Sequence, residues 1–255
     1  MFFMYFIGTA GSGKSTLTAS FAEWLKDHEL DVVTVNLDPG VRNLPYIPDV
    51  DARDYIKVED VMLNYDLGPN GALIASVDMM TGEIDKIKGE ILDLNPEYVL
   101  VDTPGQMELF AYRSAGPLIV SALGGEGVAS VYLVDPILAK NPYGYVSVLL
   151  LGISVEYRFQ IPQVYVLSKV DLLEEQERQK ILSWSEDFYK LAETINEKFS
   201  GLRREMSLKI FSILNEVGRP GELIPISASR YEGLDDLYAI LQRIYAGGED
   251  YLTFR

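Results

Sequence analysis

Residues 2–16 have the sequence FFMYFIGTAGSGKST, and this stretch decides the fold. Its first part, Phe2–Ile7, is an unbroken apolar run that ends at a glycine, which is typical of a parallel strand buried on both faces. From Ser15 to Lys26 apolar side chains recur at helical spacing, which predicts an amphipathic helix. A valine-rich run at Asp31–Leu37 follows, so the chain is expected to begin with a βαβ unit.

The segment between the first strand and the helix, Gly8–Thr16, matches the pattern G-x-x-x-x-G-K-[ST] of a P-loop, or Walker A motif. In such a loop the backbone N–H groups converge on phosphate oxygens, the lysine reaches the β- and γ-phosphates, and the serine hydroxyl meets Mg²⁺. The motif therefore predicts a nucleoside triphosphate and Mg²⁺, and leaves the base and the reaction open. The predicted phosphate-binding residues here are Gly11, Ser12, Gly13, Lys14, Ser15 and Thr16.

The same alternation of strands and helices continues along the chain. Strands separated by helix-length segments predict an α/β fold, a doubly wound, mostly parallel sheet of the P-loop NTPase type, in one domain over residues 1–255. Residues 41–95, which are turn-rich, and 174–216, which are almost continuously helical in pattern, are interpreted as insertions. The further predicted strands are Tyr98–Val101, Val128–Val134, Val164–Leu167 and Leu223–Ile226, and the predicted helices lie near 107–122, 143–158 and 234–245.

Charge and composition exclude several classes of function. The 22 basic and 38 acidic residues give a net charge of −16, so polyanions are repelled and neither a nucleic acid nor a membrane is an expected direct partner. The absence of cysteine excludes disulfides and thiolate chemistry, and the one histidine, His28, cannot form a histidine metal cluster. The apolar start lacks the basic residues and cleavage site of a signal peptide, so a cytoplasmic protein is expected.

A second set of candidate residues follows the strand at Tyr98–Val101, in the order Asp102-Thr103-Pro104-Gly105-Gln106. An aspartate at the carboxyl edge of the sheet can hold Mg²⁺ through water, beside Ser15. Gly105 would let the backbone approach a γ-phosphate, and Gln106 would orient an attacking water. The spacing D-x-x-G-Q is that of the γ-phosphate sensor of regulatory GTPases.

Two more carboxylates have more than one interpretation each. Asp38 ends the second strand and either holds a metal-bound water or the hydrolytic water, or only forms the turn of Asp38-Pro39-Gly40. Glu108 either contacts the same water, or acts across an interface, or is a solvated glutamate in the first turn of a helix.

The base is predicted from Ser168-Lys169-Val170-Asp171, a variant of N-K-x-D with serine in place of asparagine. One carboxylate, Asp171, can accept both the N1–H and the N2 amino group of guanine, whereas adenine lacks the matching pair of donors. The stem of Lys169 can lie over the purine ring. In Ser227-Ala228-Ser229 a backbone N–H would meet guanine O6, unless Ser227 is only a helix cap. Together these residues favour guanine over adenine.

Gly68-Pro69-Asn70-Gly71, taken alone, predicts a β-turn. The chain also carries the P-loop, Asn36-Leu37-Asp38-Pro39, the segment 102–108 and Ser168–Asp171. With these motifs in their order along the sequence, the chain resembles the GPN-loop GTPases from Gly8 to Ala228. The resemblance implies a homodimer in which Asn70 reaches the partner's nucleotide and replaces an arginine finger. It also implies that Asp38, Gln106 and Glu108 form the catalytic neighbourhood. Eukaryotic members of the family assist RNA polymerase assembly, so the resemblance implies a switch that acts on a client complex.

The 174–216 segment carries apolar residues at helical spacing, and two interpretations stay open for them: packing onto the domain or into the dimer, or a groove for a protein client. The residues are Trp184, Phe188, Leu191, Ile195, Phe199, Leu202, Met206, Ile210, Phe211 and Leu214.

Three functions follow from the sequence. The first is a Mg²⁺-dependent GTPase that converts GTP to GDP and phosphate, with Ser15, Asp102 and Asp38 at the metal. The second is a P-loop kinase of a small molecule, which the DTPGQ segment disfavours. The third is an assembly scaffold in which the nucleotide is structural.

Overall fold

The computed structural model describes residues 1–198, 200–217 and 223–246. Its centre is a seven-stranded sheet in which every pairing is parallel, in the order β3-β2-β4-β1-β5-β6-β7. This arrangement confirms the predicted doubly wound α/β fold. The strands are β1 (Phe2–Gly8), β2 (Val32–Asn36), β3 (Val50–Asp51), β4 (Tyr98–Asp102), β5 (Gly127–Val134), β6 (Gln163–Leu167) and β7 (Ile224–Pro225).

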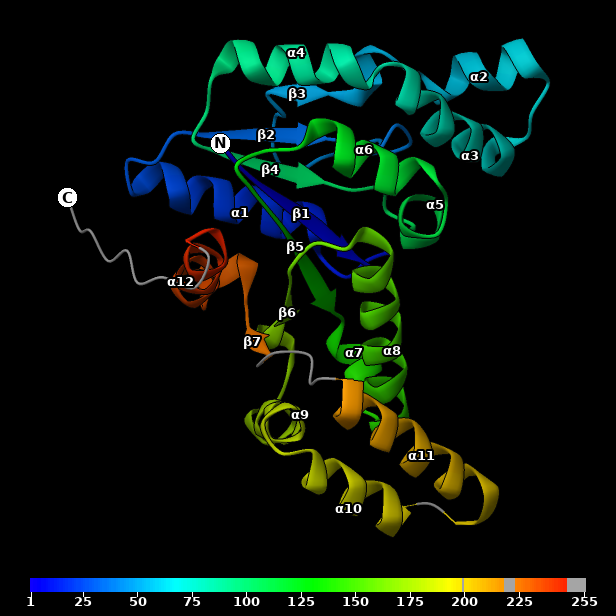
Figure 1. Cartoon of the computed structure of the whole chain (residues 1–255), viewed down its shortest axis with the longest axis vertical. Helices are drawn as coiled ribbons and strands as arrows, with labels where there is room; N and C mark the ends of the chain where they lie inside the picture. The colour runs from blue at the N-terminus through cyan, green and yellow to red at the C-terminus, as the bar shows by residue number, and fades with distance from the viewer. Residues whose placement is uncertain (199, 218–222, 247–255) are drawn as a thin grey trace.

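Helices cover both faces of the sheet (Figure 1). Helices α1 and α12 pack on one face, whereas α4, α6 and α8 pack on the other. The α-helices are α1 (Lys14–Asp27), α2 (Val58–Tyr65), α3 (Pro69–Met79), α4 (Ile84–Leu94), α5 (Met107–Ala111), α6 (Ala115–Leu123), α7 (Pro136–Ala139), α8 (Pro142–Phe159), α9 (Glu175–Glu186), α10 (Phe188–Lys198), α11 (Gly201–Val217) and α12 (Leu234–Tyr245). Short 3₁₀ turns are η1 (Ala52–Asp54), η2 (Met80–Gly82), η3 (Val170–Leu172) and η4 (Ala228–Arg230).

Strand β1 lies between β4 and β5 and contributes to both cores. Phe3 and Tyr5 face the α4–α6–α8 side, while Met4 and Phe6 face the α1–α12 side. This double burial explains why the run shows no polar alternation. The register places Phe6 opposite Asp102, so β1 and β4 end at the same edge of the sheet.

The 41–95 segment differs from the prediction of a turn-rich insertion. It contains the two-residue edge strand β3 and the helices α2, α3 and α4, and α4 is the crossover helix that leads into β4. Its buried residues Ile84, Ile87 and Ile91 recur at helical spacing, so the sequence did carry the signal for this helix.

The predicted helix over 107–122 is wrong in one respect, because it is broken at residues 112–114 into α5 and α6. Pro117 is the reason: in a continuous helix its ring would clash with the carbonyl of Arg113, four residues earlier. Gly116 allows the two pieces to approach closely, since a Cβ atom there would lie 2.1 Å from the Phe110 carbonyl oxygen.

The 174–216 segment is helical almost throughout, as predicted, and is divided into three helices, α9, α10 and α11. Helices α10 and α11 contact α8 (Figure 1). Trp184, Leu191, Ile195 and Leu214 are buried in the larger core and Ile210 packs against it, whereas Leu202 and Met206 are exposed. Packing onto the domain therefore accounts for part of the apolar set. Phe199 lies outside the described residues, as do the side chains of Phe188 and Phe211. None of the helices in the described part of the chain is long and apolar enough to cross a membrane.

Candidate functional site

The P-loop joins β1 to α1. Gly11 and Gly13 have φ angles of 74° and 100°, a left-handed region that favours glycine. Lys14 is the first residue of α1, and its buried Nζ donates hydrogen bonds to the carbonyl oxygens of Gly8 at 3.0 Å, Thr9 at 3.1 Å and Gly105 at 3.0 Å. The lysine therefore ties the P-loop to the segment after β4.

The charge of Lys14 is set by opposing influences. Burial lowers the pKa of Lys14, while the carboxylates of Asp102, Asp38 and Glu108 raise it. All three carboxylates thus lie within electrostatic reach of the lysine, in a molecule of net charge −16. Lys14 is thus the positive group that a phosphate would meet, and Mg²⁺ would offset the carboxylates around it.

Asp102, at the end of β4, has the environment of a metal-binding carboxylate. Burial raises the pKa of Asp102 to about 6, against the Ser15 hydroxyl, Lys14 and Tyr46, which lower it. Its Oδ2 accepts a hydrogen bond from the Tyr46 hydroxyl at 3.2 Å, whereas Oδ1 is buried with no partner among the described residues. An orphaned carboxylate oxygen near a serine hydroxyl fits Mg²⁺.

No cluster of three or more histidine or carboxylate side chains that could hold a metal occurs in the described ranges. Mg²⁺ in a nucleotide site takes one or two protein ligands and completes its shell with phosphates and water. Ser15 and Asp102 are the residues with the right chemistry.

Asp38 forms the predicted turn and also contacts the segment after β4. Its Oδ1 accepts from the Gly40 N–H at 2.9 Å, which is the predicted turn, and its Oδ2 accepts from the Gly105 N–H at 2.7 Å. The N–H predicted to meet a γ-phosphate is thus hydrogen-bonded to a carboxylate. The buried Asn36 side chain holds this turn through the N–H and the carbonyl of Asp38, at 3.0 and 3.2 Å, a role the sequence did not reveal.

Gln106 and Glu108 lie at the beginning of α5, the first as its N-cap residue and the second in its first turn. Both side chains are exposed. The first-turn position of Glu108 agrees with the solvated interpretation, while its influence on Lys14 places it near the phosphate site.

All of the predicted guanine residues except Ser227 line one cavity of about 180 Å³. Its lining combines P-loop residues with the two distant motifs, Ser168–Asp171 and Ser227–Ser229, so segments far apart in the sequence share it. The lining residues are Gly13, Thr16, Leu17, Ser168, Lys169, Asp171, Ile226, Ala228 and Ser229. Ser227 is buried directly beside this set.

Asp171 is held by the residues that follow β7. Its Oδ1 accepts from the Ser227 hydroxyl at 2.7 Å and its Oδ2 from the Ser229 hydroxyl at 3.3 Å. The Ser227 bond lowers the pKa of Asp171, which keeps the carboxylate ionised. Ser227 occupies the N-cap position of η4, as the helix-cap interpretation requires, but its hydroxyl makes no cap hydrogen bond there and supports Asp171 instead.

Lys169 bridges the base and phosphate sides. Its Nζ donates to Asp135 Oδ2 at 3.0 Å and to the Gly11 carbonyl of the P-loop. Ser168 donates from Oγ to the Val134 carbonyl at 3.1 Å, so it joins β6 to β5. Asp135 and Tyr46 were not predicted, because neither belongs to a recognisable motif.

Gly68-Pro69-Asn70 does not form a β-turn, as the isolated motif predicted, but begins α3. Gly68 is the N-cap residue, Pro69 the first helical residue, and Asn70 is exposed in the first turn. Proline at the first helical position is favoured because its missing N–H would have no helical partner there. Asn70 is therefore presented at the end of a rigid helix.

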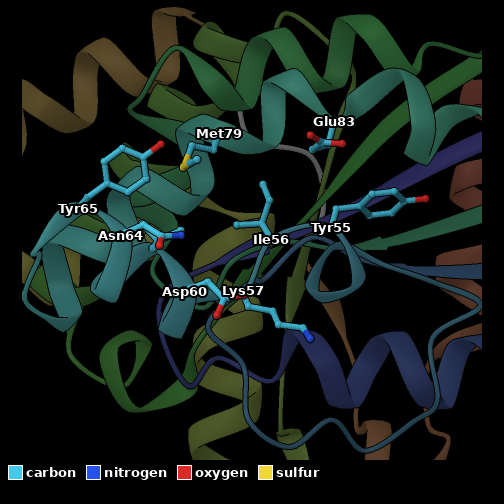
Figure 2. A pocket seen from close by; sticks show the side chains of 9 residues that line it. Tyr55, Ile56, Lys57, Asp60, Asn64, Tyr65, Met79 and Glu83 are labelled. Atoms are coloured by element: carbon cyan, nitrogen blue, oxygen red, sulfur yellow. The ribbon is translucent and has the colours of Figure 1, made fainter.

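A second cavity of about 240 Å³ lies beside α3 (Figure 2). Ile56, from the segment after η1, and Val61, from α2, are its buried apolar residues, and Met79 contributes from the end of α3. Lys57, Asp60 and Glu83 surround it with mixed charge, so it does not have the chemistry of a phosphate site.

Comparisons with known proteins agree with this geometry. A family model described as a conserved hypothetical ATP binding protein matches residues 6–247. The chain is 37% identical over 244 residues to GPN-loop GTPase PAB0955 of Pyrococcus abyssi, covering 94% of this chain and 96% of that protein. It is 30% identical over 255 residues to GPN-loop GTPase 1 of Dictyostelium discoideum, covering 96% of this chain and 61% of that longer protein. The apo crystal structure of PAB0955 matches with a TM-score of 0.86 and 35% identity, over 96% of this chain and 97% of that one.

Proposed function

The chain belongs to the GPN-loop GTPase family, and on that premise we propose that it binds GTP with Mg²⁺ and hydrolyses it to GDP and phosphate. The observation that carries the proposal is the single cavity in which Asp171 and the P-loop residues Gly13 and Thr16 meet. A purine bound by Asp171 would have its phosphates at the N-terminus of α1.

The phosphates would be bound by the backbone N–H groups of residues 11–16, by Lys14 and by the Gly105 N–H. Lys14 would exchange its three carbonyl partners for phosphate oxygens, which is favourable because the ammonium is attracted more strongly to a charged oxygen than to a neutral carbonyl. Ser15, Asp102 and Asp38 would hold Mg²⁺ or its waters. When bound, Mg²⁺ would neutralise charge that develops on the β- and γ-phosphates.

The Gly105 N–H supplies a means to sense the γ-phosphate. In the structure this donor is taken by Asp38 at 2.7 Å. A γ-phosphate that takes the Gly105 N–H would displace the like-charged carboxylate of Asp38. Asp38 would then be free, with Gln106 and Glu108, to orient the attacking water or to hold a metal-bound water.

We further propose a homodimer in which Asn70, at the start of α3, donates its amide to the partner's phosphates. A neutral amide donor is a known means of stabilising developing charge in a transition state. The single domain would act in the cytoplasm as a nucleotide-controlled switch, with α9–α11 as the surface for a protein client such as an RNA polymerase assembly intermediate.

Calorimetry with GTP and ATP in the presence of Mg²⁺, combined with the oligomer mass in each state, tests the proposal. We expect heat and dimer formation with GTP and at least about tenfold weaker binding of ATP, the equivalent of about 1.4 kcal/mol. Lys14→Ala should abolish GTP binding, whereas Gln106→Ala should retain binding and slow phosphate release. Parental GTP affinity in Lys14→Ala, or a preference for ATP, would contradict the assignment.

A further inference from the structure

Helix α3 carries Asn70 at one end, and the other end is fixed by an ion pair. Asp78, the penultimate residue of α3, accepts from Arg113 Nε at 2.8 Å and from Arg113 Nη2 at 2.5 Å. Two parallel N–H donors on one carboxylate fix orientation as well as distance, which a lysine could not do.

Arg113 lies in the break between α5 and α6, seven residues after Gln106. This break is itself anchored to the core: Arg158 of α8 donates from Nε to the Ala111 carbonyl at 2.5 Å, and its guanidinium lies 5.7 Å from the centre of the Tyr112 ring. Arg113 therefore extends from a backbone segment that is anchored to α8. Because Arg113 binds α3, it positions α3 relative to the segment that begins with Gln106.

Helix α3 also contacts the turn that contains Asp38, another residue proposed to orient water. A Cβ atom at Gly40 would lie 2.6 Å from Leu73 Cδ1, so the turn that holds Asp38 packs directly against the middle of α3. Toward its C-terminal end the helix buries Ser76 and Val77, while Met79 lines the cavity of about 240 Å³ (Figure 2). One face of this end is thus held by packing, and the paired hydrogen bonds from Arg113 to Asp78 add a directional constraint on the side that faces solvent.

We propose that Arg113, through its paired hydrogen bonds to Asp78, is a positioning residue that sets the orientation of α3 and thereby of Asn70. Asn70 and Asp78 lie eight residues apart, about 12 Å along the helix at 1.5 Å per residue, so a tilt at Asp78 displaces Asn70. The inference rests on the proposed function, in which Asn70 serves the partner's nucleotide. Arg113 would thus set the geometric relation between Asn70 and the protomer's own Gln106 segment.

The ion pair is well suited to a test because both side chains are about 40% exposed. Such pairs contribute little to the free energy of unfolding, so variants should fold. Arg113→Ala and Asp78→Ala should lower the turnover of saturating GTP about tenfold, since a displacement near 1 Å can cost that much or more. GTP affinity should stay within twofold of the parent. Lys140→Ala, which breaks the Lys140–Glu177 pair of similar exposure, is the matched control and should leave turnover unchanged.

A double-mutant cycle with Asn70→Ala shows whether Arg113 acts through Asn70. Adding Arg113→Ala to Asn70→Ala should cause no further loss, and the exchanged pair Arg113→Asp with Asp78→Arg should recover at least half of the parental turnover. Parental turnover in Arg113→Ala, or an equal loss in both backgrounds, overturns the inference and leaves the GTPase assignment intact. Parental turnover in Asn70→Ala itself instead refutes the proposed role of Asn70, and the inference with it.

Discussion

Replacing Asp171 with asparagine should change the base that the site prefers. The carboxylate is held by Ser227 and Ser229, and each of its oxygens retains a lone pair for the base. With asparagine the amide oxygen can still accept guanine N1–H, but the amide nitrogen is a donor and faces the N2 amino group, which is also a donor. Xanthine carries a carbonyl oxygen at this position, so the variant is complementary to xanthine.

The magnitude follows from the bonds that are lost. A hydrogen bond to a charged group contributes about 1.5–3 kcal/mol, and the substitution removes one such bond and weakens the other. A total loss near 3 kcal/mol corresponds to GTP binding on the order of 100-fold weaker. Xanthosine triphosphate should gain affinity by a similar factor, because the amide nitrogen introduced by Asp171→Asn donates to the xanthine carbonyl oxygen.

Competition between GTP and xanthosine triphosphate for a fluorescent nucleotide, with Mg²⁺ present, measures both changes. Asp236→Asn, which removes an exposed carboxylate in the first turn of α12, is the control and should leave both affinities unchanged. If Asp171→Asn weakens GTP and xanthosine triphosphate equally, Asp171 supports the fold of the pocket and does not recognise the base.

Three other perturbations test the structure around the site. Asp102→Asn should raise the free energy of unfolding of the nucleotide-free protein at pH 7.5 by up to about 3 kcal/mol. Burial raises the pKa of Asp102 to about 6, so its ionisation costs the folded state an amount that grows from about pH 4 to pH 6 and is constant above pH 6. The gain should therefore vanish near pH 4, where denaturation curves would show equal stability. Tyr46→Phe removes a donor to Asp102, so the acid limb of Mg²⁺-dependent GTP binding should move upward by about half to one pH unit, and an unchanged profile would exclude the contact. Gly116→Ala should lower the free energy of unfolding by about 1–3 kcal/mol, because the added methyl group would clash with the Phe110 carbonyl oxygen. An unchanged melting temperature would show that α5 and α6 can move apart at no cost.

The first strand, the P-loop and α1 were predictable because each signal is local. An apolar run, glycines with positive φ and a helical pattern succeed one another within residues 2–26, and no distant partner is needed to interpret them. Asp171 was predictable for the same reason, since a short motif at a strand end identifies it. The environment of Asp171 was not, because its hydrogen bond with Ser227 joins residues 56 positions apart.

The start of α3 illustrates a local signal with two valid interpretations. Proline with φ near −65° is favoured both at the second position of a β-turn and at the first position of a helix. The choice depends on the residues after Gly71, because Ala72, Ser76 and Val77 are buried at helical spacing against the core. Burial of the residues that follow therefore determines the conformation of Gly68-Pro69-Asn70-Gly71. The tetrapeptide alone does not determine it.

The joint between α5 and α6 shows how a local rule can create a long-range contact. Pro117 prevents a continuous helix at Arg113, and Gly116 allows the two pieces to pack together. Because Arg113 is released from helical geometry, its guanidinium can pair with Asp78 on α3. Both residues that make the break lie outside the nucleotide motifs, yet they determine where the arginine points. A substitution of Pro117 that lets α5 and α6 merge would therefore separate Arg113 from Asp78 without touching the nucleotide site, and it should reproduce the turnover of Arg113→Ala at unchanged GTP affinity.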